Sequence, residues 1–221
     1  MARGEVLLET MKLTRRYGPV VALDALDLKV RAGECVVMMG PNGSGKTTAA
    51  ELISGLLEPS DGRAEICGHS IHQEPAAVAA RRDLAYVPDT PYLYDDLTVS
   101  DHLRLVAAAH GVGDQDLNVR SEALLERLDL VDRAAFFPRQ LSRGMRQKTA
   151  IACALIRPFQ VLVVDEPIAG LDAASVNVFR EVLLECRKAR RAVLLMTHSD
   201  AFASTVATKM LQIQEGRLVG S

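Results

Sequence analysis

The sequence lacks paired cysteines, long apolar runs and an excess of charge of either sign. No apolar run approaches the ~18 residues of a membrane-spanning helix, and residues 1–9 lack the apolar segment of a signal peptide. The formal net charge is -2 and the isoelectric point is near 6.2. Composition therefore gives no reason to expect binding to nucleic acid or to an acidic membrane surface.

The four cysteines are scattered along the chain without a C-x-x-C pair, at Cys35, Cys67, Cys153 and Cys186. This pattern argues against a disulfide framework and indicates buried thiols in a reducing cytosol. Cys67 lies near His69 and His72, but their spacing suits no standard zinc site, and Gly68 indicates a turn. We therefore expect no metal site there.

The apolar residues, 48% of the 221, predict a folded α/β protein with one substantial core. Residues 35–39, 161–164 and 193–196 are short and fully apolar, which is typical of parallel strands covered on both faces. Residues 7–13 and 25–30 alternate enough to predict antiparallel strands at a sheet edge. The expected fold is a mostly parallel core sheet with an antiparallel N-terminal edge sheet.

A change to helical spacing between residues 100 and 158 predicts a helical insertion in this sheet protein. No internal repeat, linker or low-complexity segment divides the chain. We therefore expect a single domain over residues 1–221, with residues 1–89 and 158–221 forming the core. Residues 90–157 are expected to form the helical subdomain.

The most informative stretch is a glycine-rich loop between the strand at 35–39 and a helix beginning near residue 48. It consists of Gly40, Pro41, Asn42, Gly43, Ser44, Gly45, Lys46, Thr47 and Thr48. The glycines allow backbone N–H groups to surround phosphate oxygens, and the helix directs its positive end at the same anion. Lys46 would supply charge to the outer phosphates and Thr47 an oxygen ligand to Mg²⁺. The strand before the loop and the helix after it disfavour a chance glycine-rich turn.

Two adjacent carboxylates, Asp165 and Glu166, follow the apolar strand at 161–164. Open α/β sheets bind ligands at the carboxyl ends of their strands. Asp165 would hold Mg²⁺ through water, and Glu166 would act as general base toward an attacking water. The alternative is a helix N-cap with a solvated neighbour, which the upstream phosphate loop disfavours.

A third group of residues opens the long helix that ends near Pro158. Ser142 is expected to be its N-cap, so the helix start combines a hydroxyl, a glycine and basic residues. This start resembles the LSGGQ signature of ATP-binding cassette (ABC) ATPases. Leu141, Ser142 and Gly144 match the signature, whereas Arg143 and Met145 depart from it.

Other landmarks of the ABC family follow in order over nearly the whole chain. Tyr17 resembles the aromatic residue that stacks on adenine, although a rim or core tyrosine is the alternative. Asp172 lies in a segment that resembles the loop contacting the other subunit, and is counted among the nucleotide-binding residues. His198 resembles the switch histidine at the γ-phosphate, although it could be a satisfied turn residue. The resemblance implies a catalytic set of Lys46, Glu166 and His198.

Asp89 occupies the position where the ABC family usually has glutamine. A carboxylate can ligate Mg²⁺, but it repels phosphate oxygens when the metal is absent. The alternative is a residue that caps the turn after Pro88. The acidic residue and the departures in the signature together resemble a branch of bacterial exporter ATPases.

The resemblance implies a P-loop ATPase of ABC type that binds ATP and Mg²⁺. It is expected to power transport, in the direction of export, through a separate membrane permease. Each nucleotide would be shared between the phosphate loop of one subunit and the signature of a second in a head-to-tail dimer, expected to be a homodimer. The chain would lie at the cytoplasmic face of the membrane. Two alternatives are a soluble ABC ATPase that remodels DNA, ribosomes or iron–sulfur scaffolds and a small-molecule kinase; no nucleic-acid partner is expected.

Overall fold

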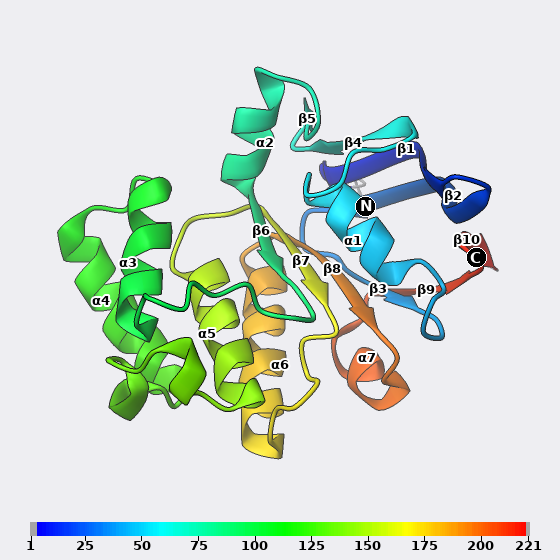
Figure 1. Cartoon of the computed structure of the whole chain (residues 1–221). Helices are drawn as coiled ribbons and strands as arrows, with labels where there is room; N and C mark the ends of the chain where they lie inside the picture. The colour runs from blue at the N-terminus through cyan, green and yellow to red at the C-terminus, as the bar shows by residue number, and fades with distance from the viewer. Residues whose placement is uncertain (1–3, 220–221) are drawn as a thin grey trace. The chain divides into compact units, whose positions relative to one another are not determined.

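Residues 4–219 are described by the structure, a computed structural model (Figure 1). These residues form two units. The first unit comprises residues 4–86, 159–166 and 180–219. The second comprises residues 87–158 and 167–179. The segment 167–179, which the sequence pattern assigned to the core, therefore belongs to the helical unit.

An antiparallel sheet with the strand order β2-β1-β4-β5 forms one layer of the first unit. Its strands are β1 (Val6–Tyr17), β2 (Val20–Arg31), β4 (Asp61–Ile66) and β5 (His69–Ser70). The long β1–β2 pair confirms the predicted antiparallel strands, but both run further than the alternation indicated. Positive φ angles of 49° at Lys12 and 48° at Ala25 accompany shifts in their register, and such shifts interrupt a strict alternation of apolar residues.

The second sheet of this unit has the order β10-β9-β3-β8-β7-β6. Its strands are β3 (Cys35–Met39), β6 (Leu84–Val87), β7 (Val161–Asp165), β8 (Ala192–Thr197), β9 (Lys209–Gln214) and β10 (Arg217–Val219). β3 pairs in parallel with β8 and β9, and β7 pairs in parallel with β8. Every residue of β3, β7 and β8 is buried. The prediction of a parallel sheet covered on both faces is confirmed.

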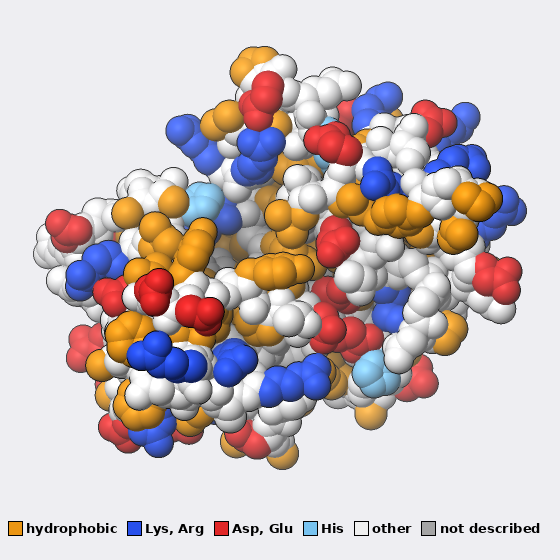
Figure 2. Space-filling model, viewed as in Figure 1, with side chains coloured by type: hydrophobic (Ala, Val, Ile, Leu, Met, Phe, Trp, Pro, Cys, Tyr) orange, Lys and Arg blue, Asp and Glu red, His pale blue; other side chains and the backbone are white. Residues whose placement is uncertain are grey.

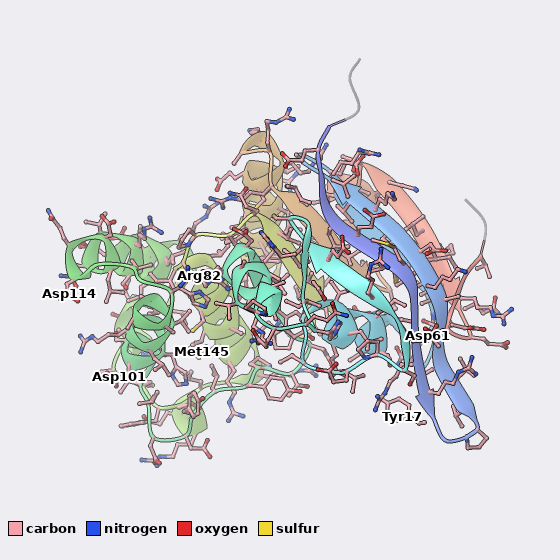
Figure 3. All side chains as sticks on the ribbon, turned by 90° about the horizontal axis from the view of Figure 1, so that it is seen from above. Tyr17, Asp61, Arg82, Asp101, Asp114 and Met145 are labelled. Atoms are coloured by element: carbon pink, nitrogen blue, oxygen red, sulfur yellow. The ribbon has the colours of Figure 1, made fainter. Side chains whose placement is uncertain are left out.

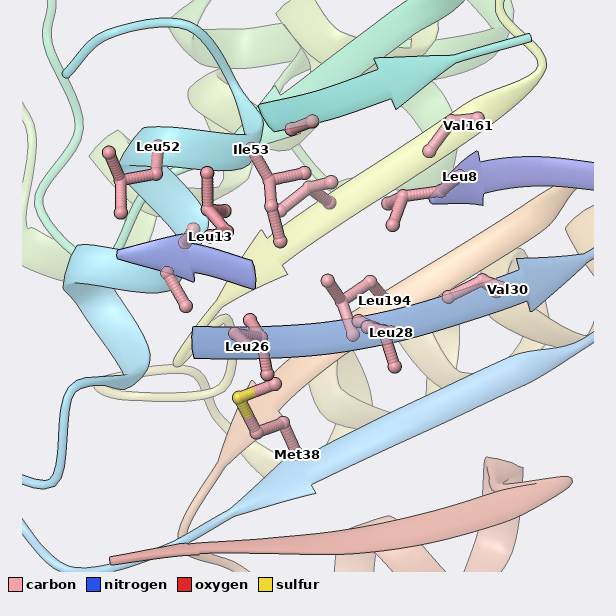
Figure 4. Packing of buried hydrophobic residues seen from close by; sticks show 14 of the residues in the cluster. Leu8, Leu13, Leu26, Leu28, Val30, Met38, Leu52, Ile53, Val161 and Leu194 are labelled. Carbon is pink, nitrogen blue, oxygen red and sulfur yellow. The ribbon is translucent and has the colours of Figure 1, made fainter. Parts of the chain in front are cut away.

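Side chains from both sheets and from α1 (Lys46–Ile53) form the core of the first unit (Figure 4). Leu8, Leu26 and Leu28 of the antiparallel sheet belong to the same buried cluster as Met38 and Leu194 of the parallel sheet. Each large side chain removed from water stabilises the fold by about 1.5–3 kcal/mol. This packing holds the ends of β3, β7 and β8, where the predicted site residues lie.

The second unit is built mainly from helices. They are α3 (Val99–Ala109), α4 (Asp114–Arg127), α5 (Arg143–Leu155) and the short 3₁₀ helices at Val131–Arg133 and Pro138–Gln140. α3 begins with a capping box in which Thr98 and Asp101 exchange hydrogen bonds. Ser142 is the N-cap of α5, as predicted, and helix α6 (Ala173–Lys188) begins in this unit and ends in the first.

Several helices and strands were not predicted from the sequence, because their residue patterns are too short or too weakly periodic. They are α2 (Ala76–Asp83), α7 (Asp200–Val206), β5, β9 and β10. β9 places exposed residues on either side of the buried Leu211 and Ile213, which is typical of a strand that is buried on one face only. Of the cysteines, Cys35 and Cys186 are buried as expected, whereas Cys67 and Cys153 are half-buried. Burial raises the pKa of the Cys35 and Cys153 thiols to about 12.

The surface view in Figure 2 shows acidic, basic and hydrophobic side chains interspersed over the face that it presents. Among residues 4–219, no group of three or more His, Cys, Asp or Glu side chains is arranged to hold a metal ion by itself. Over the same residues, every helix falls short of the length and apolar character needed to cross a bilayer.

A buried histidine holds the segment that precedes α3. His102 Nε2 accepts a hydrogen bond of 2.8 Å from the backbone N–H of Tyr94, and Nδ1 donates to the Thr98 carbonyl at 2.7 Å. We expect His102→Ala to destabilise the protein by about 1–3 kcal/mol, because the Tyr94 N–H loses its acceptor. Urea unfolding would measure the change, with the exposed neighbour Arg104 as control, for which Arg104→Ala should stay within about 0.5 kcal/mol. Equal effects of the two variants would contradict this assignment.

Candidate functional site

Three glycines shape the loop between β3 and α1. Gly43 and Gly45 have positive φ angles of 78° and 104°, which other residues adopt only with strain. A Cβ atom added to Gly40 would lie 2.3 Å from the carbonyl oxygen of Ile213, and one added to Gly45 would lie 2.6 Å from that of Ala22. Glycine is therefore required at both positions, and the loop backbone stays free of side chains that would obstruct an anion.

Lys46 is the first residue of α1, and its ammonium group turns back toward the loop. The side chain is buried, and Nζ donates to the carbonyls of Gly40 at 2.7 Å and Pro41 at 3.1 Å. Nζ also lies 3.9 Å from Oε1 of Glu166. Charged phosphate oxygens are stronger acceptors than neutral carbonyls. The ammonium is therefore positioned to exchange these carbonyls for a phosphate.

The remaining loop residues fit a polyphosphate. The Ser44 hydroxyl is buried and has no hydrogen-bond partner within residues 4–219, so it is available to a ligand. Thr47 and Thr48 lie in the first turn of α1, which contains no acidic residue to compete with an anion. Thr47 is exposed, and so are Pro41, Asn42 and Gly43.

Asp165 and Glu166 lie at the end of β7, but they differ in burial and in backbone conformation. Asp165 is the last residue of the strand and is fully buried. Glu166 has a positive φ of 43°, and its backbone N–H donates to the Met196 carbonyl at 3.0 Å. A non-glycine residue in this conformation costs free energy and is typical of functional sites. The hydroxyl of Thr47 and the carboxylate of Asp165 are oxygen ligands of the kind that Mg²⁺ prefers.

The Glu166 side chain is held by two residues from the end of β8. His198 Nδ1 lies 2.9 Å from Oε2 of Glu166, and the buried Thr197 hydroxyl donates to the same oxygen at 3.3 Å. His198 is itself largely exposed. Because β7 and β8 are parallel neighbours, their ends bring together groups separated by about thirty residues. The structure thus joins Lys46, Glu166 and His198 in one cluster.

Tyr17 is the last residue of β1 and is 47% exposed, at the end of the β1–β2 pair (Figure 3). The Arg15 guanidinium lies 4.5 Å from the centroid of the Tyr17 ring. Arg15 is in turn held by a hydrogen bond of 2.9 Å from Nη1 to the Glu58 carbonyl. The tyrosine is therefore no core residue: its ring is accessible and has a cation over one face.

Ser142 and Gly144 lie at the start of α5 in the second unit. Ser142 is exposed, and its hydroxyl accepts a hydrogen bond of 3.2 Å from the Met145 N–H. A Cβ atom added to Gly144 would lie 2.5 Å from the Gly170 carbonyl oxygen. Gly144 is therefore required where the start of α5 contacts the segment before α6.

Asp172 caps helix α6. Its Oδ1 accepts hydrogen bonds of 2.8 Å from both the N–H and the hydroxyl of Ser175. These bonds lower the pKa of the Asp172 carboxyl. The buried Lys148 of α5 places its Nζ 3.9 Å from Asp172 Oδ2 and 3.7 Å from Asp129 Oδ2. The structure thus gives Asp172 a local role as a helix cap, and its predicted role in nucleotide binding stays a prediction.

Asp89 is partly exposed and pairs with a residue of the signature segment. Arg143 Nη2 lies 3.8 Å from Asp89 Oδ1. One helical turn further along α5, Gln147 Nε2 donates to the Pro88 carbonyl at 3.2 Å. The segment containing Asp89 is thus attached to α5 at two points.

Three further residues with contacts in or near the site were not predicted from the sequence: Arg15, Thr197 and Lys148. Thr197 directly precedes the predicted His198, and Arg15 stands two residues before Tyr17 on the same face of β1. Their positions next to predicted site residues could therefore have indicated both. No sequence pattern indicated a role for Lys148, because its two acidic neighbours come from segments distant in sequence. Such a buried cation is visible only once the fold is known.

A glycine loop between a buried parallel strand and a helix, with Lys46 near the Glu166 carboxylate that follows another strand of the same sheet, defines a P-loop nucleoside triphosphatase. A sequence model of the family described as "ABC transporter" matches residues 23–169. The chain belongs to the ABC transporter family, as an ATP-binding domain that hydrolyses ATP.

Relatives and solved structures agree with this assignment. The ABC-type transporter ATP-binding protein EcsA of Bacillus subtilis is 32% identical over 96% of this chain and 85% of its own length. The Nod factor export ATP-binding protein I of Cupriavidus pinatubonensis is 35% identical over 96% of this chain, which spans 65% of that relative. A solved ATP-binding subunit of an ABC transporter matches with a TM-score of 0.90 and 34% identity, covering 97% of this chain and 88% of that one.

A bacterial ABC transporter cassette solved as a dimer matches with a TM-score of 0.86 and 24% identity over 97% of both chains. At that identity, the likeness supports the fold alone. The predicted fold class, an α/β P-loop domain of ABC type with an antiparallel edge sheet and a helical subdomain, is confirmed.

Proposed function

We propose that this chain is the ATP-hydrolysing subunit of an exporter and drives a separate membrane permease from the cytoplasmic face of the membrane. The names of two relatives support the proposal, because one is an ABC-type transporter ATP-binding protein and the other a Nod factor export ATP-binding protein. The alignment with the first covers 85% of that protein. The transported substrate would be determined by the permease.

The observation that carries the proposal is the cluster of Lys46, Glu166 and His198. Glu166 would accept a proton from the attacking water, while His198 and Thr197 hold the carboxylate through Oε2. Oε1 then remains directed toward Lys46 at 3.9 Å. Lys46 would leave the carbonyls of Gly40 and Pro41 and neutralise the outer phosphates.

A magnesium ion bound with ATP would supply positive charge to the phosphate oxygens. The exposed residue Thr47 and the buried residue Asp165 are proposed to hold it through their side-chain oxygens. The Ser44 hydroxyl and the helix α1 start would contribute hydrogen bonds to the phosphates themselves.

We assign Ser142 and Gly144 to the nucleotide of a second cassette. Ser142 is exposed at a helix start, where N–H groups favour an anion. Two chains arranged head to tail would then enclose two ATP molecules, and hydrolysis would weaken their contact. Gly144 packs against Gly170, and Asp172 follows Gly170 in the same segment. Asp172 would therefore lie near the same interface between the two cassettes.

The segment before α3 is proposed to contribute to the permease contact. Tyr92 and Tyr94 are 74% and 65% exposed, and exposed aromatic residues are enriched in protein interfaces. His102 holds this segment in place through the Tyr94 N–H.

An ATPase assay on the purified chain tests the proposed function. Phosphate release from Mg·ATP without any acceptor is expected, and it would exclude a small-molecule kinase. Co-purification with a multispanning permease from detergent-solubilised membranes would separate a transporter subunit from a soluble ABC ATPase. Phosphate transfer that requires an added acceptor would argue against the proposal. Purification of the chain without any associated membrane protein would argue against it as well.

The proposed adenine contact of Tyr17 gives a prediction about binding. We expect Tyr17→Ala to raise the Kd for ATP by roughly 5- to 100-fold, because stacking on an aromatic ring contributes about 1–3 kcal/mol per base. Isothermal titration calorimetry would measure it, and Tyr17→Phe should retain affinity. Binding of tripolyphosphate, which has no base, should be unchanged in Tyr17→Ala. Unchanged ATP affinity would make Tyr17 a rim residue.

A further inference from the structure

Two departures from the usual ABC sequence meet in the second unit. Arg143 replaces a glycine of the signature and Asp89 replaces a glutamine, and they lie 54 residues apart in sequence. In the structure Arg143 Nη2 approaches Asp89 Oδ1 at 3.8 Å. The two unusual residues thus carry opposite charges and face each other.

Helix electrostatics explain why a cation at this position needs an anion. Arg143 is the first residue of α5, Arg146 is in the same turn, and this turn contains no acidic residue. Positive side chains at a helix N-terminus oppose the helix dipole. Arg146 donates from Nε to the Pro138 carbonyl at 3.0 Å. Asp89 therefore supplies, from another segment, the negative charge that the first turn lacks.

The Arg143 side chain also contacts a third segment. Its Cδ and Cγ would lie 3.4 and 3.5 Å from a Cβ atom added to Gly170, so its stem passes over that glycine. The adjacent Gly144 packs against the Gly170 carbonyl. Together with the Gln147 bond to Pro88, these contacts join three segments at the start of α5.

We infer that Asp89 and Arg143 form a positioning pair, in which Asp89 is the counter-ion of Arg143 and ties the Pro88–Asp89 segment to the start of α5. Arg143 is the positioning residue for both Asp89 and the Gly170 segment. The inference rests on the proposed function for its catalytic consequence: breaking the pair lets the Pro88–Asp89 segment and the signature start move independently, which lowers the efficiency of ATP-dependent dimer closure.

The size of the effect follows from exposure. The Asp89 and Arg143 side chains are 43% and 69% exposed, and exposed ion pairs change an equilibrium by about 2- to 5-fold. They are also screened by salt. A coupling of that size at low ionic strength, lost at about 1 M salt, is therefore the expected signature.

A double-mutant cycle on the full chain tests the pair. Asp89→Gln and Arg143→Gln should each raise the ATP concentration for half-maximal hydrolysis by about 2- to 5-fold at low salt. The double variant should be no worse than either single variant, because the second change removes a partner already without its counter-ion. Arg104→Gln combined with Asp89→Gln is the matched control and should give additive effects.

A magnesium titration at fixed ATP separates this pair from a metal ligand. The Mg²⁺ concentration for half-maximal hydrolysis should be the same in wild type, Asp89→Gln and Arg143→Gln. A rise in Asp89→Gln alone would make Asp89 a metal ligand and overturn the inference. Additive effects of the two substitutions at low salt would overturn it as well.

Failure of the proposed function would be recognised separately. A wild-type chain without ATPase activity would reject that function, but the same four proteins can still be unfolded thermally at low and high salt. If the pair forms, the change in melting temperature of the double variant should differ from the sum of the two single changes by about 1–3 °C at low salt. At high salt the two values should agree. Additive melting temperatures under both conditions would overturn the pair regardless of activity.

Discussion

Replacing Glu166 by glutamine is expected to lower kcat for ATP hydrolysis by roughly 10²- to 10⁴-fold, while Mg·ATP still binds. Glutamine retains the size of the side chain but cannot accept the proton of the attacking water. Its amide can still contact Thr197 and His198, the residues that hold Oε2. The measurement is phosphate release at saturating ATP, together with nucleotide affinity by calorimetry.

The same variant should accumulate as an ATP-bound dimer on gel filtration, since closure would no longer be reversed by hydrolysis. Lys46→Ala is the control, because removal of the buried ammonium should abolish nucleotide binding itself. Wild-type turnover in Glu166→Gln would transfer the role of base to another group. His198, 2.9 Å from Glu166, would be the next candidate.

Ser142→Arg is expected to abolish ATP-dependent dimerisation and to reduce hydrolysis by ~10²-fold or more, comparable to loss of an electrostatic stabiliser of the transition state. ATP affinity of the isolated chain should remain nearly unchanged, because Ser142 is assigned to the nucleotide of the second cassette. Gel filtration with ATP measures the dimer, and calorimetry under conditions that keep the chain monomeric measures the affinity.

Loss of the helix cap is a separate effect of this substitution. Ser142 accepts the Met145 N–H, and removing such a cap costs about 1 kcal/mol. Ser142→Ala loses the same bond without added bulk, so the two variants should have similar melting temperatures, whereas ATP-dependent dimerisation should be abolished in Ser142→Arg and only weakened in Ser142→Ala. If Ser142→Arg lost nucleotide affinity as severely as Lys46→Ala, Ser142 would belong to the pocket of its own chain and the composite site would be wrong.

Local sequence determined the parts of this protein whose chemistry is contiguous. The phosphate loop could be predicted because its glycines, lysine and threonines are consecutive and stand between a fully apolar strand and a helix. The buried strands β7 and β8 were equally clear, since strands covered on both faces have continuous apolar runs. The cap at Ser142 required only a hydroxyl before a helical pattern.

Tertiary structure decided which of these residues meet. Glu166 contacts His198 because β7 and β8 are parallel neighbours, and strand order is not encoded in any local pattern. Asp89 could be read from the sequence as a metal ligand or a turn residue, but its pairing with Arg143 depends on the path of the chain before α3. Likewise, Gly144 is confined by the carbonyl of Gly170. Residue type determines what a side chain can do, whereas packing of distant segments determines its partner.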